Sequence, residues 1–353
     1  MTDAQPTGAG AAIGGPSSAP HLVGRTPAAD PERLVAELVP PPHFAGATFD
    51  TYLPDDRHPS QAAAVERLRV AVPDVGAPGA RWWRRSRRTR PVAVYLDGGF
   101  GVGKTHLLAS FAHAVGLERT AYGTFVEYTN LVGALGFLPT VERLTTKSLV
   151  CIDEFELDDP GDTVLMARLL RELADRGVAL AATSNTLPGS LGEGRFAAED
   201  FLREIQSLSD RFEVLRVDGE DYRHRAVVTD APRLGDDEVR AAAAARADAT
   251  VDDFPALLEH LARVHPSRYG ALLDGVGLVG LTGVQPVPRQ DVALRLVVLV
   301  DRLYDRDVPV LLGGGEAALF PAEMLRGGYR KKYYRALSRL GALAAEGARL
   351  VQS

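Results

Sequence analysis

The stretch Pro91-Val-Ala-Val-Tyr-Leu-Asp-Gly-Gly-Phe-Gly-Val-Gly-Lys-Thr105 decides the fold of this 353-residue chain. A short apolar run ends at glycines, and apolar residues at helical spacing begin directly after Thr105. Glycines let the backbone curl so that successive N–H groups point at an anion, and the following helix adds the positive end of its dipole. Four residues match the G-x-x-x-x-G-K-S/T spacing of a phosphate-binding loop: Gly98, Gly103, Lys104 and Thr105. Because strand, loop and helix follow in the required order, we predict a nucleoside triphosphate site rather than a chance match.

The residue types of this loop predict separate roles. Lys104 is expected to reach the terminal phosphates and to contribute to catalysis, and the Thr105 hydroxyl is expected to ligate Mg²⁺. No guanine-reading N-K-x-D motif appears in the sequence, and ATP is the nucleotide that we expect. The residues expected to bind it are Gly98, Gly99, Phe100, Gly101, Val102, Gly103, Lys104, Thr105 and His106.

A second apolar run ends in paired carboxylates, in Ser148-Leu-Val-Cys-Ile-Asp-Glu-Phe155. Asp153 is expected to hold Mg²⁺, directly or through water, and Glu154 to polarise the attacking water. Paired acids after an apolar run are common, but after a phosphate loop in the same chain they form a specific pattern. The next apolar run, Val178–Ala182, leads to Asn185, which we expect to orient the attacking water. An asparagine at this position also suits a simple turn.

Composition places the chain among ordinary globular proteins, with 46% hydrophobic and 24% charged residues. The net charge of −6 argues against a surface generally coated by nucleic acid, although a local basic site is compatible with it. The single cysteine, Cys151, excludes an intramolecular disulfide framework. No apolar run approaches the roughly 18 residues of a membrane span, and residues 1–29 lack the pattern of a signal peptide. We therefore expect a cytoplasmic protein in which residues 1–29 form a disordered tail.

Residues 30–90 are expected to form a helical flank of the nucleotide-binding core. Short helices are predicted over Asp30–Val39 and Ser60–Val72, each capped by its first residue. Residues 81–90, RWWRRSRRTR, hold six arginines and two tryptophans. Such a run supplies charge and stacking for a nucleic acid, an anionic membrane or an acidic protein, but it equally fits a solvated loop whose tryptophans fold onto the core. The sequence leaves these alternatives open.

The rest of the chain is expected to comprise a core over 91–230 and a C-terminal extension over 231–353. In the extension we predict helices over Asp237–Asp248, Val292–Tyr304 and Tyr329–Leu350, and strands over Val276–Val284 and Val308–Leu312. The sequence thus predicts an α/β protein with a mixed helical and strand extension.

In this order, the motifs resemble those of the AFG-type ATPases of the AAA+ class, the family of the bacterial ZapE-like division ATPases. The resemblance spans residues 95–343, and its IDEF, ATSN and DYR motifs are more specific than a phosphate loop alone. It is carried by YLDGGFGVGKTHLL (95–108), LVCIDEFELDDPGD (149–162), VALAATSNTLPGSL (178–191), EDYRHR (220–225), LVVLVDRLYDRDVPVLL (296–312) and YYRALSRLGAL (333–343).

The resemblance implies a P-loop NTPase of AAA+ type, with a parallel-sheet core flanked by helices. It also implies ATP hydrolysis with Mg²⁺, assembly into a ring and the remodelling of a protein partner. Bacterial members are described as acting on the tubulin-like FtsZ polymer at the division site, and mitochondrial relatives are tied to the inner membrane. The resemblance therefore implies recruitment of this chain to the division site or to the inner membrane face.

The resemblance further implies two kinds of functional arginine. AAA+ proteins often carry a sensor arginine on a C-terminal helix, and Arg339 fits the family pattern best, with Arg335 as the second choice. For an arginine acting on the nucleotide of a neighbouring subunit, the family pattern favours Arg195, and the general Arg-Phe pattern before a strand favours Arg211. One departure from the family is Val102, which stands where an arginine usually precedes Gly-Lys-Thr.

Two other functions fit parts of the sequence. The GKTHLL end of the loop also resembles initiator and helicase-loader ATPases of DNA replication. A protein of that kind is expected to carry a basic DNA-binding module, and none is evident in this acidic chain. A scaffold that binds nucleotide without hydrolysing it would have no need of Glu154. We therefore expect an ATPase that remodels a protein partner.

Overall fold

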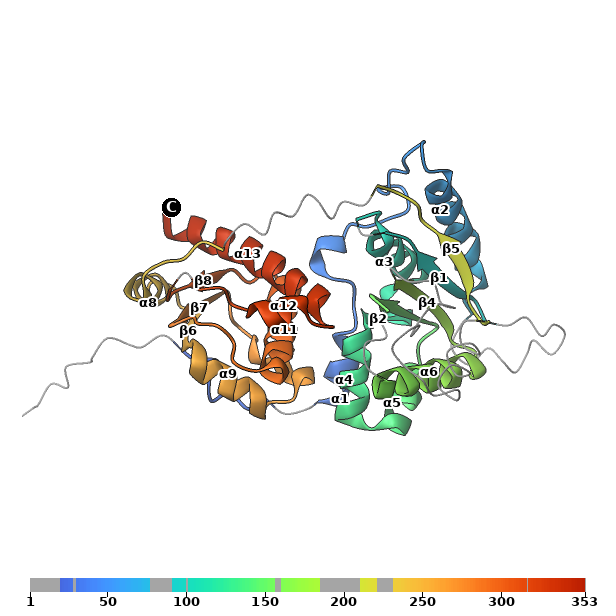
Figure 1. The fold of residues 1–353 in the computed structure, drawn as a ribbon. Coiled ribbons are helices and arrows are strands. Elements are labelled where there is room, and N and C mark those ends of the chain that lie inside the picture. The colour runs from blue at the N-terminus through green and yellow to red at the C-terminus, as the bar shows by residue number, and fades with distance from the viewer. Residues whose placement is uncertain are drawn as a thin grey trace, which may run out of the picture.

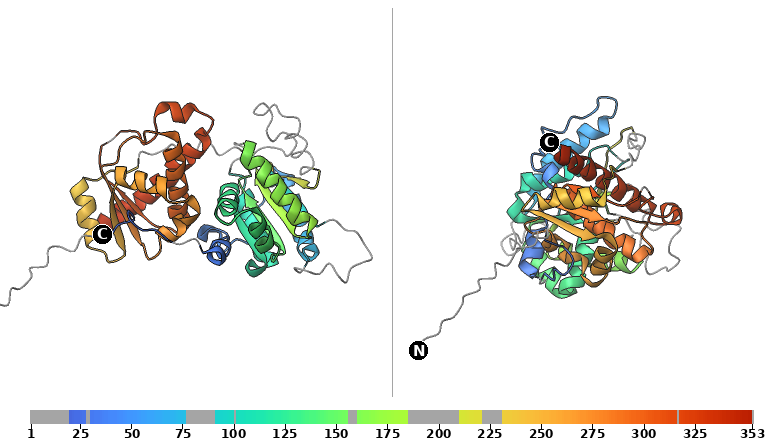
Figure 2. Two further views of the ribbon diagram at one scale, coloured as in Figure 1. Left: turned by 90° about the horizontal axis from the view of Figure 1, so that it is seen from below. Right: turned by 90° about the vertical axis from the view of Figure 1, so that its left-hand side faces the viewer.

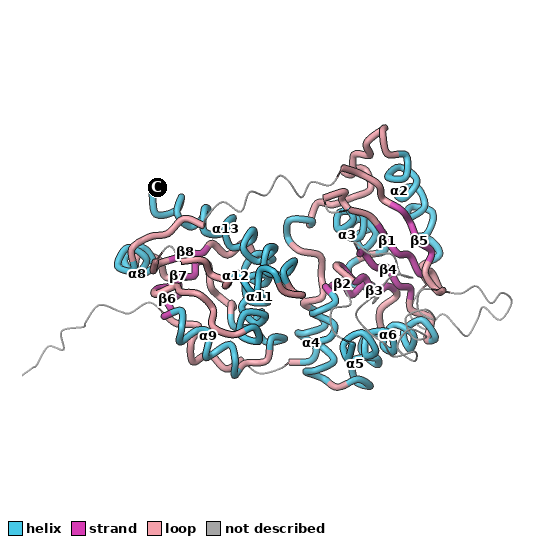
Figure 3. Tube along the Cα trace, viewed as in Figure 1, coloured by secondary structure: helices cyan, strands magenta, loops and turns pink. Residues whose placement is uncertain are grey.

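The computed structural model folds into two α/β units, each built on its own parallel sheet (Figure 1). The core unit holds five strands, and the C-terminal unit, residues 231–352, holds three strands. Figure 3 shows both sheets in magenta, each accompanied by helices. The structure describes residues 20–27, 30–76, 91–99, 101–155, 160–184, 210–220, 231–315 and 317–352.

The core sheet is parallel throughout, with the strand order β2-β3-β4-β1-β5. Every residue of β3 and β4 is buried, as expected for central strands covered on both faces. The parallel register brings the carboxyl ends of the strands to one edge, where the phosphate loop follows β1. The strands are β1 (Ala93–Asp97), β2 (Thr120–Thr124), β3 (Leu149–Asp153), β4 (Ala179–Ser184) and β5 (Glu213–Arg216).

Two hydrophobic clusters cover the two faces of the core sheet. One contains Val94, Leu96 and Cys151 with side chains of α2 and α3, and the other contains Tyr95 and Ile152 with side chains of α4, α5 and α6. The alternation follows from the two-residue period of a strand. Figure 2 shows these helices packed along the sheet. The helices are α2 (Pro59–Ala71), α3 (Lys104–Val115), α4 (Phe125–Leu135), α5 (Phe137–Leu144) and α6 (Pro160–Asp175).

The C-terminal unit is a second parallel sheet, with the order β6-β7-β8. Helix α8 packs over one side, while α9, α11 and α13 contribute to the larger cluster that includes residues of β7 and β8. The strands are β6 (Ala249–Asp253), β7 (Leu278–Thr282) and β8 (Val310–Leu312), and the helices are α8 (Asp236–Ala244), α9 (Phe254–Arg263), α10 (Tyr269–Leu272), α11 (Gln290–Asp305), α12 (Ala322–Arg326) and α13 (Arg330–Gln352). The predicted fold class, a parallel-sheet core flanked by helices with a mixed C-terminal extension, is confirmed.

The N-terminal flank contains the predicted helices with one change at a cap. Helix α1 (Pro31–Ala36) is capped by Asp30, whose carboxylate accepts from the backbone N–H groups of Glu32 and Arg33. Helix α2 begins at Pro59, and Ser60 lies inside it, where its hydroxyl accepts instead from the backbone N–H of Asp218 at 3.0 Å. The expectation that Ser60 caps the helix is therefore wrong. Short 3₁₀ turns span Pro42–Phe44, Val72–Asp74, Leu117–Arg119 and Pro266–Arg268.

Part of the N-terminal tail lies on the C-terminal unit. Leu22 is fully buried in the large cluster of that unit, and the backbone N–H of Val251 in β6 donates to the carbonyl of Pro20. The carboxylate of Asp252, itself buried, accepts from the backbone N–H groups of Leu22 and Val23, both at 2.9 Å. Residues 20–27 of the expected tail are therefore a bound segment, and its remaining residues, 1–19 and 28–29, lie outside the described part of the chain.

Replacing Asp252 by Ala should destabilise the C-terminal unit. The change leaves two backbone N–H groups without their acceptor, and we expect the free energy of unfolding to fall by roughly 2–4 kcal/mol. Chemical denaturation of the full chain measures this loss. Glu259→Ala, an exposed residue of α9, is the matched control and should cost less than about 0.5 kcal/mol. Equal effects of the two substitutions would contradict the anchoring role of Asp252.

Candidate functional site

The loop between β1 and α3 has the backbone of a phosphate cradle. Gly101 and Gly103 have φ angles of 78° and 87°, in the left-handed region that glycine adopts without strain. Gly103 is also the residue before the first turn of α3, so the loop runs directly into a helix N-terminus. The Nζ of Lys104 is turned back over the loop and donates to the carbonyls of Gly98 and Gly99, at 2.8 and 2.5 Å.

Two close contacts explain why the loop needs glycine at its ends. A Cβ at Gly98 would lie 2.1 Å from the carbonyl oxygen of Val217, and one at Gly103 would lie 2.5 Å from the ring of Tyr52. The Tyr52 hydroxyl donates to the carbonyl of Val102 at 2.8 Å. Burial raises the pKa of Tyr52 to about 12, so this hydroxyl stays protonated and keeps its role as donor. The N-terminal flank thus holds the phosphate loop in place.

His106 faces this flank. Its Nε2 lies 3.0 Å from the Thr51 hydroxyl and 3.2 Å from the Thr48 carbonyl, and its ring packs beside Tyr52. Its predicted contact with the nucleotide stays a prediction. Phe100, another residue predicted to bind nucleotide, lies outside the described residues.

The carboxylate of Asp153 is buried at the end of β3 and is surrounded by hydroxyl donors. Thr105 donates to it at 3.3 Å and Tyr122 at 3.1 Å, and the hydroxyl of Thr183 also donates. Burial, followed by the Asp153 charge, raises the pKa of Tyr122 well above its usual value, so this phenol remains a donor. The structure therefore brings Thr105 and Asp153 together, as the prediction of a shared Mg²⁺ site requires.

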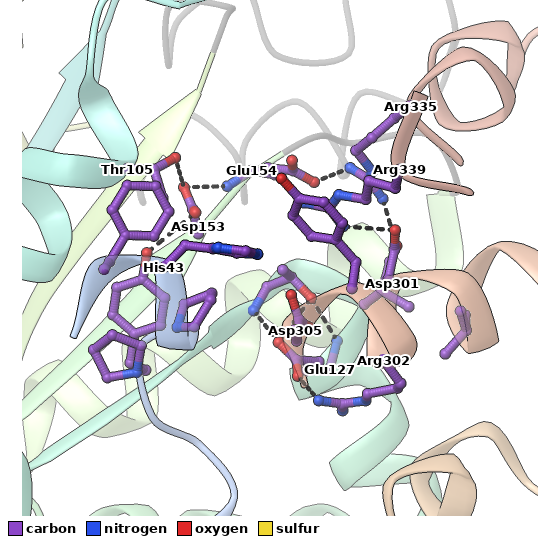
Figure 4. A pocket seen from close by; sticks show the side chains of 18 of the residues that line it. His43, Thr105, Glu127, Asp153, Glu154, Asp301, Arg302, Asp305, Arg335 and Arg339 are labelled. Carbon is purple, nitrogen blue, oxygen red and sulfur yellow. Dashed lines mark hydrogen bonds and ion pairs between the residues drawn. The ribbon is translucent and has the colours of Figure 1, made fainter. Parts of the chain in front are cut away.

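Glu154 has an unusual backbone. Its φ is 53°, in the left-handed region, where residues other than glycine are uncommon. Its backbone N–H lies 3.1 Å from the Asp153 carboxylate and 3.0 Å from the Thr183 hydroxyl, both of which accept from it. The main chain at Glu154 is therefore fixed, and the side chain projects from the sheet edge toward the C-terminal unit (Figure 4).

Arginines of α13 meet Glu154 from the other unit. Arg335 donates to the carboxylate of Glu154 and, at 2.9 Å, to Oδ2 of Asp301 on α11. Arg339 donates to Oδ1 of the same Asp301 at 2.6 Å, and its guanidinium lies 5.0 Å from the centre of the Tyr304 ring. Burial lowers the pKa of Arg335 to about 9, which leaves it charged at neutral pH. Arg335, the second choice from the sequence, is the arginine that contacts Glu154.

A cavity of about 600 Å³ lies between the two units. The ring of His43 packs against that of Tyr304 on its wall, with 4.7 Å between the centroids. Burial, followed by the Glu127 charge, raises the pKa of Asp305 to about 7. A further ion pair joins Arg302 to Glu127 across the units. Charged lining residues include Glu127, Asp153 and Glu154 of the core and Asp301, Arg302, Asp305, Arg335 and Arg339 of the C-terminal unit.

The structure places Arg211 away from the phosphate loop of its own chain. It precedes β5, at the amino ends of the strands, and donates to Asp175 at 2.8 Å. An action on nucleotide would therefore require a neighbouring subunit, and this stays a prediction. Asn185, Arg195 and residues 81–90 lie outside the described residues.

Sequence reasoning missed three residues of the site. Tyr122 and Thr183 lie on strands that neighbour β3, and Asp301 interrupts α11 directly after its apolar run Leu296–Val300. That interruption was the available signal for Asp301. The hydroxyl of Tyr122 carried no sequence signal. Thr183 belongs to the ATSN motif, but its contact with Asp153, like that of Tyr122, depends on strand order and could not be predicted.

Comparison with known proteins identifies the family. Two stretches, residues 28–236 and 235–349, match the model of the AFG1-like ATPase family. The chain belongs to the AFG1-like ATPase family. This confirms the predicted resemblance and the predicted enzyme class, a P-loop ATPase of AAA+ type.

This AFG1-like ATPase is similar to the cell division protein ZapE of Escherichia coli K12, with 32% identity over 162 residues. The match covers 42% of this chain and 43% of that protein. An uncharacterized protein of Schizosaccharomyces pombe is 28% identical over 150 residues, covering 38% of this chain and 33% of that protein. The matched regions thus span less than half the length of these curated relatives.

Solved structures resemble the AFG1-like ATPase weakly. Domain III of the replication initiation protein DnaA from Thermotoga maritima is 22% identical with a TM-score of 0.36, covering 49% of this chain and 67% of that chain. The DnaC helicase loader is 17% identical with a TM-score of 0.36, covering 50% of this chain and 99% of that chain. Such low scores add nothing to the assignment of function.

Gly103→Ala should distort the phosphate loop. The new methyl group would meet the Tyr52 ring, and the left-handed φ would be strained by about 1–2 kcal/mol in addition. We expect a lower thermal midpoint and weaker binding of a fluorescent ATP analogue. Gly99→Ala is the control for stability, because no described atom lies within 4 Å of its Cβ position. A G103A protein as stable as G99A would contradict the packing described here.

Proposed function

We propose that this AFG1-like ATPase hydrolyses ATP with Mg²⁺ and uses the reaction to remodel a protein partner, an FtsZ-like division polymer. The observation that carries the proposal is the meeting of Lys104, Asp153 and Glu154 at one edge of the core sheet. These groups are the minimum that phosphoryl transfer requires: a cation for the phosphates, a metal ligand and a base for water.

Phosphate binding falls to the loop and its lysine. The backbone N–H groups of residues 98–105 and the start of α3 would hold the phosphates, and the Lys104 ammonium would exchange its two loop carbonyls for phosphate oxygens. The exchange would replace each of these two hydrogen bonds of the buried ammonium by one to phosphate.

Thr105 and Asp153 would hold Mg²⁺, which supplies positive charge next to the terminal phosphates. A hydroxyl and a carboxylate suit this ion, because Mg²⁺ prefers oxygen ligands and takes its others from phosphates and water. Among the described residues, no group of three or more His, Cys, Asp and Glu side chains could form an all-protein metal site. The donor set therefore fits a metal that arrives with the nucleotide.

Glu154 would act as the general base that activates water, with Asn185 helping to orient it. Arg339 would sense the nucleotide from α13, and Arg195 or Arg211 would act on the nucleotide of a neighbouring subunit in a ring. Support for a trans action comes from the position of Arg211, which faces away from the loop of its own chain. A specific activity that stays constant as the protein is diluted to monomer would argue against it.

An FtsZ-like partner is supported by the similarity to the cell division protein ZapE. A role at the division site implies a cytoplasmic location, with recruitment to the inner membrane face. Within the part of the chain that the structure describes, no helix is long and apolar enough to cross a membrane. The alternative function is that of a DNA helicase loader. A helicase loader should bind single-stranded DNA, and this binding should be lost when the arginines of residues 81–90 are replaced. The same arginine variant also tests whether these residues bind anionic lipid vesicles.

Glu154→Gln should abolish turnover while leaving nucleotide binding intact. Loss of a positioned general base lowers the rate by about 10²–10⁴. ATP turnover and a sedimentation profile should be measured for both proteins, with and without purified FtsZ. We expect wild-type protein to turn over ATP and to change the sedimentation of FtsZ only with nucleotide.

Glu142→Gln, an exposed glutamate of α5, is the matched control and should retain turnover. Turnover in E154Q equal to that of E142Q would refute the role of Glu154. Normal turnover with no effect on FtsZ would retain the ATPase and exclude this partner.

Tyr122→Phe should weaken the use of Mg²⁺. The change removes one hydrogen bond to Asp153, and loss of such an outer contact typically costs about 10–100-fold in metal affinity or activity. The Mg²⁺ concentration for half-maximal turnover should therefore rise at least about tenfold. Tyr128→Phe is the control, because its buried hydroxyl donates to the carbonyls of Ala121 and Cys151 and not to Asp153. An unchanged Mg²⁺ requirement in Y122F would contradict the metal site.

A further inference from the structure

We infer that Asp301 is a positioning residue, which holds the guanidinium of Arg335 against the carboxylate of Glu154. Arg335 restrains this proposed base until the terminal phosphate of a nucleoside triphosphate competes with Glu154 for the guanidinium. The inference deepens the proposed function and rests on it, because the restrained group is the proposed base. It assigns roles to Asp301 and Arg335, on α11 and α13 of the C-terminal unit.

Asp301 orients two arginines at once. Its two carboxylate oxygens each accept from a different guanidinium, Arg335 at 2.9 Å and Arg339 at 2.6 Å. Burial raises the pKa of Asp301, and the charge and hydrogen bond of Arg339 oppose that shift by stabilising the ionised carboxylate. The three side chains therefore behave as one charged group on the packed helices α11 and α13, and they move as the C-terminal unit moves.

Glu154 can respond to Arg335 only through its side chain. Its backbone N–H is held by Asp153 and Thr183, and its φ of 53° is fixed by the turn after β3. The carboxylate therefore points where its partner lies. A carboxylate engaged by a guanidinium is a poor acceptor for the proton of a water molecule, because its lone pairs and charge are already used.

Arg335 has the capacity to bind a further anion. A guanidinium carries five N–H donors. The Nε of Arg335 is buried and has no hydrogen-bond partner among the described residues. Thr105, Asp153 and Arg335 line the same cavity, so a phosphate held beside Thr105 would lie in the same space as the guanidinium. A terminal phosphate offers more charge and more acceptor oxygens than a carboxylate, and Arg is suited to bind it with two donors. Binding of the triphosphate would thus free Glu154 for water.

A double-mutant cycle tests this inference. Thermal midpoints are measured for wild type, Glu154→Gln, Arg335→Gln and the double variant, first without nucleotide and then with Mg²⁺ and a saturating non-hydrolysable ATP analogue. Without nucleotide, we expect the double variant to lose no more than the larger of the two single losses, because either change alone breaks the pair. With the analogue, the two losses should become additive.

Asp301→Asn should abolish most of the coupling between Glu154 and Arg335, since Asp301 acts through the arginine. Asp305→Asn, one turn further along the same helix, should leave the coupling unchanged. Arg349→Gln controls for the loss of a positive charge on α13. The Nε of Arg349 donates to the carbonyl of Ala345 in its own helix. If R335Q does not fold, Arg335→Lys replaces it, because lysine keeps the charge but lacks the planar fork that spans both carboxylates.

Additive losses without nucleotide would overturn the inference, and so would coupling that persists unchanged with the analogue. These measurements require no turnover. If wild-type protein binds the analogue but fails to hydrolyse ATP, the proposed function fails, while the restraint of Glu154 and its release are still measured.

Discussion

The buried carboxylate of Asp153 is the constraint on which the site depends. A buried, ionised carboxylate costs several kcal/mol unless donors surround it. Here the donors come from three different elements, α3, β2 and β4, and the backbone N–H of Glu154 adds a fourth. Tyr122 of β2 lies opposite Cys151 of β3 in the sheet. Asp153 follows Cys151 by two residues, so Tyr122 and Asp153 lie on the same face. A slip of one residue between β2 and β3 would turn its hydroxyl to the other face. The hydrogen bonds that satisfy the Asp153 carboxylate therefore require this strand order and register, and the proposed metal site depends on both.

The two units meet through charged side chains rather than through a shared apolar core. Each of the three large hydrophobic clusters lies within one unit. Leu22 of the N-terminal segment packs into the cluster of the C-terminal unit. Across the boundary, Arg302 pairs with Glu127, Arg306 with Glu37 and Arg335 with Glu154. Removing one partner of such a pair leaves a partly buried charge uncompensated, so a pair opens at low cost only when another ion of the same sign replaces the partner that leaves. An incoming polyanion can therefore compete at this boundary, which a hydrophobic seam would not permit.

The sequence was sufficient to place the groups whose position is set by local spacing. Lys104, Thr105, Asp153 and Glu154 were predicted because each follows a strand at a defined distance, and the structure brings them to one edge. The partner of Glu154 could not be predicted in the same way, because Arg335 lies 181 positions away and reaches it only through the packing of α11 and α13. The family pattern favoured Arg339, and both arginines converge on Asp301. The second parallel sheet was also only partly predicted: β7 and β8 were expected, but β6 and α9 were not, since the short, charged ATVDD run of β6 does not read as a buried strand.

The path of the chain limits how the two units can move. The segment 20–27 is bound to the C-terminal unit, whereas α1, which follows it, packs on α4 of the core and on the C-terminal unit through Arg33 and Asp274. From Pro27 to Asp30 the chain can extend only about 11 Å. Large separation of the units near α1 would therefore break either the anchoring at Asp252 or the packing of α1. Movement that preserves both must pivot near α1, and its amplitude grows toward the far side of the boundary. Because Arg335 contacts Glu154 across the cavity, a rotation about that pivot would change the distance between these two side chains.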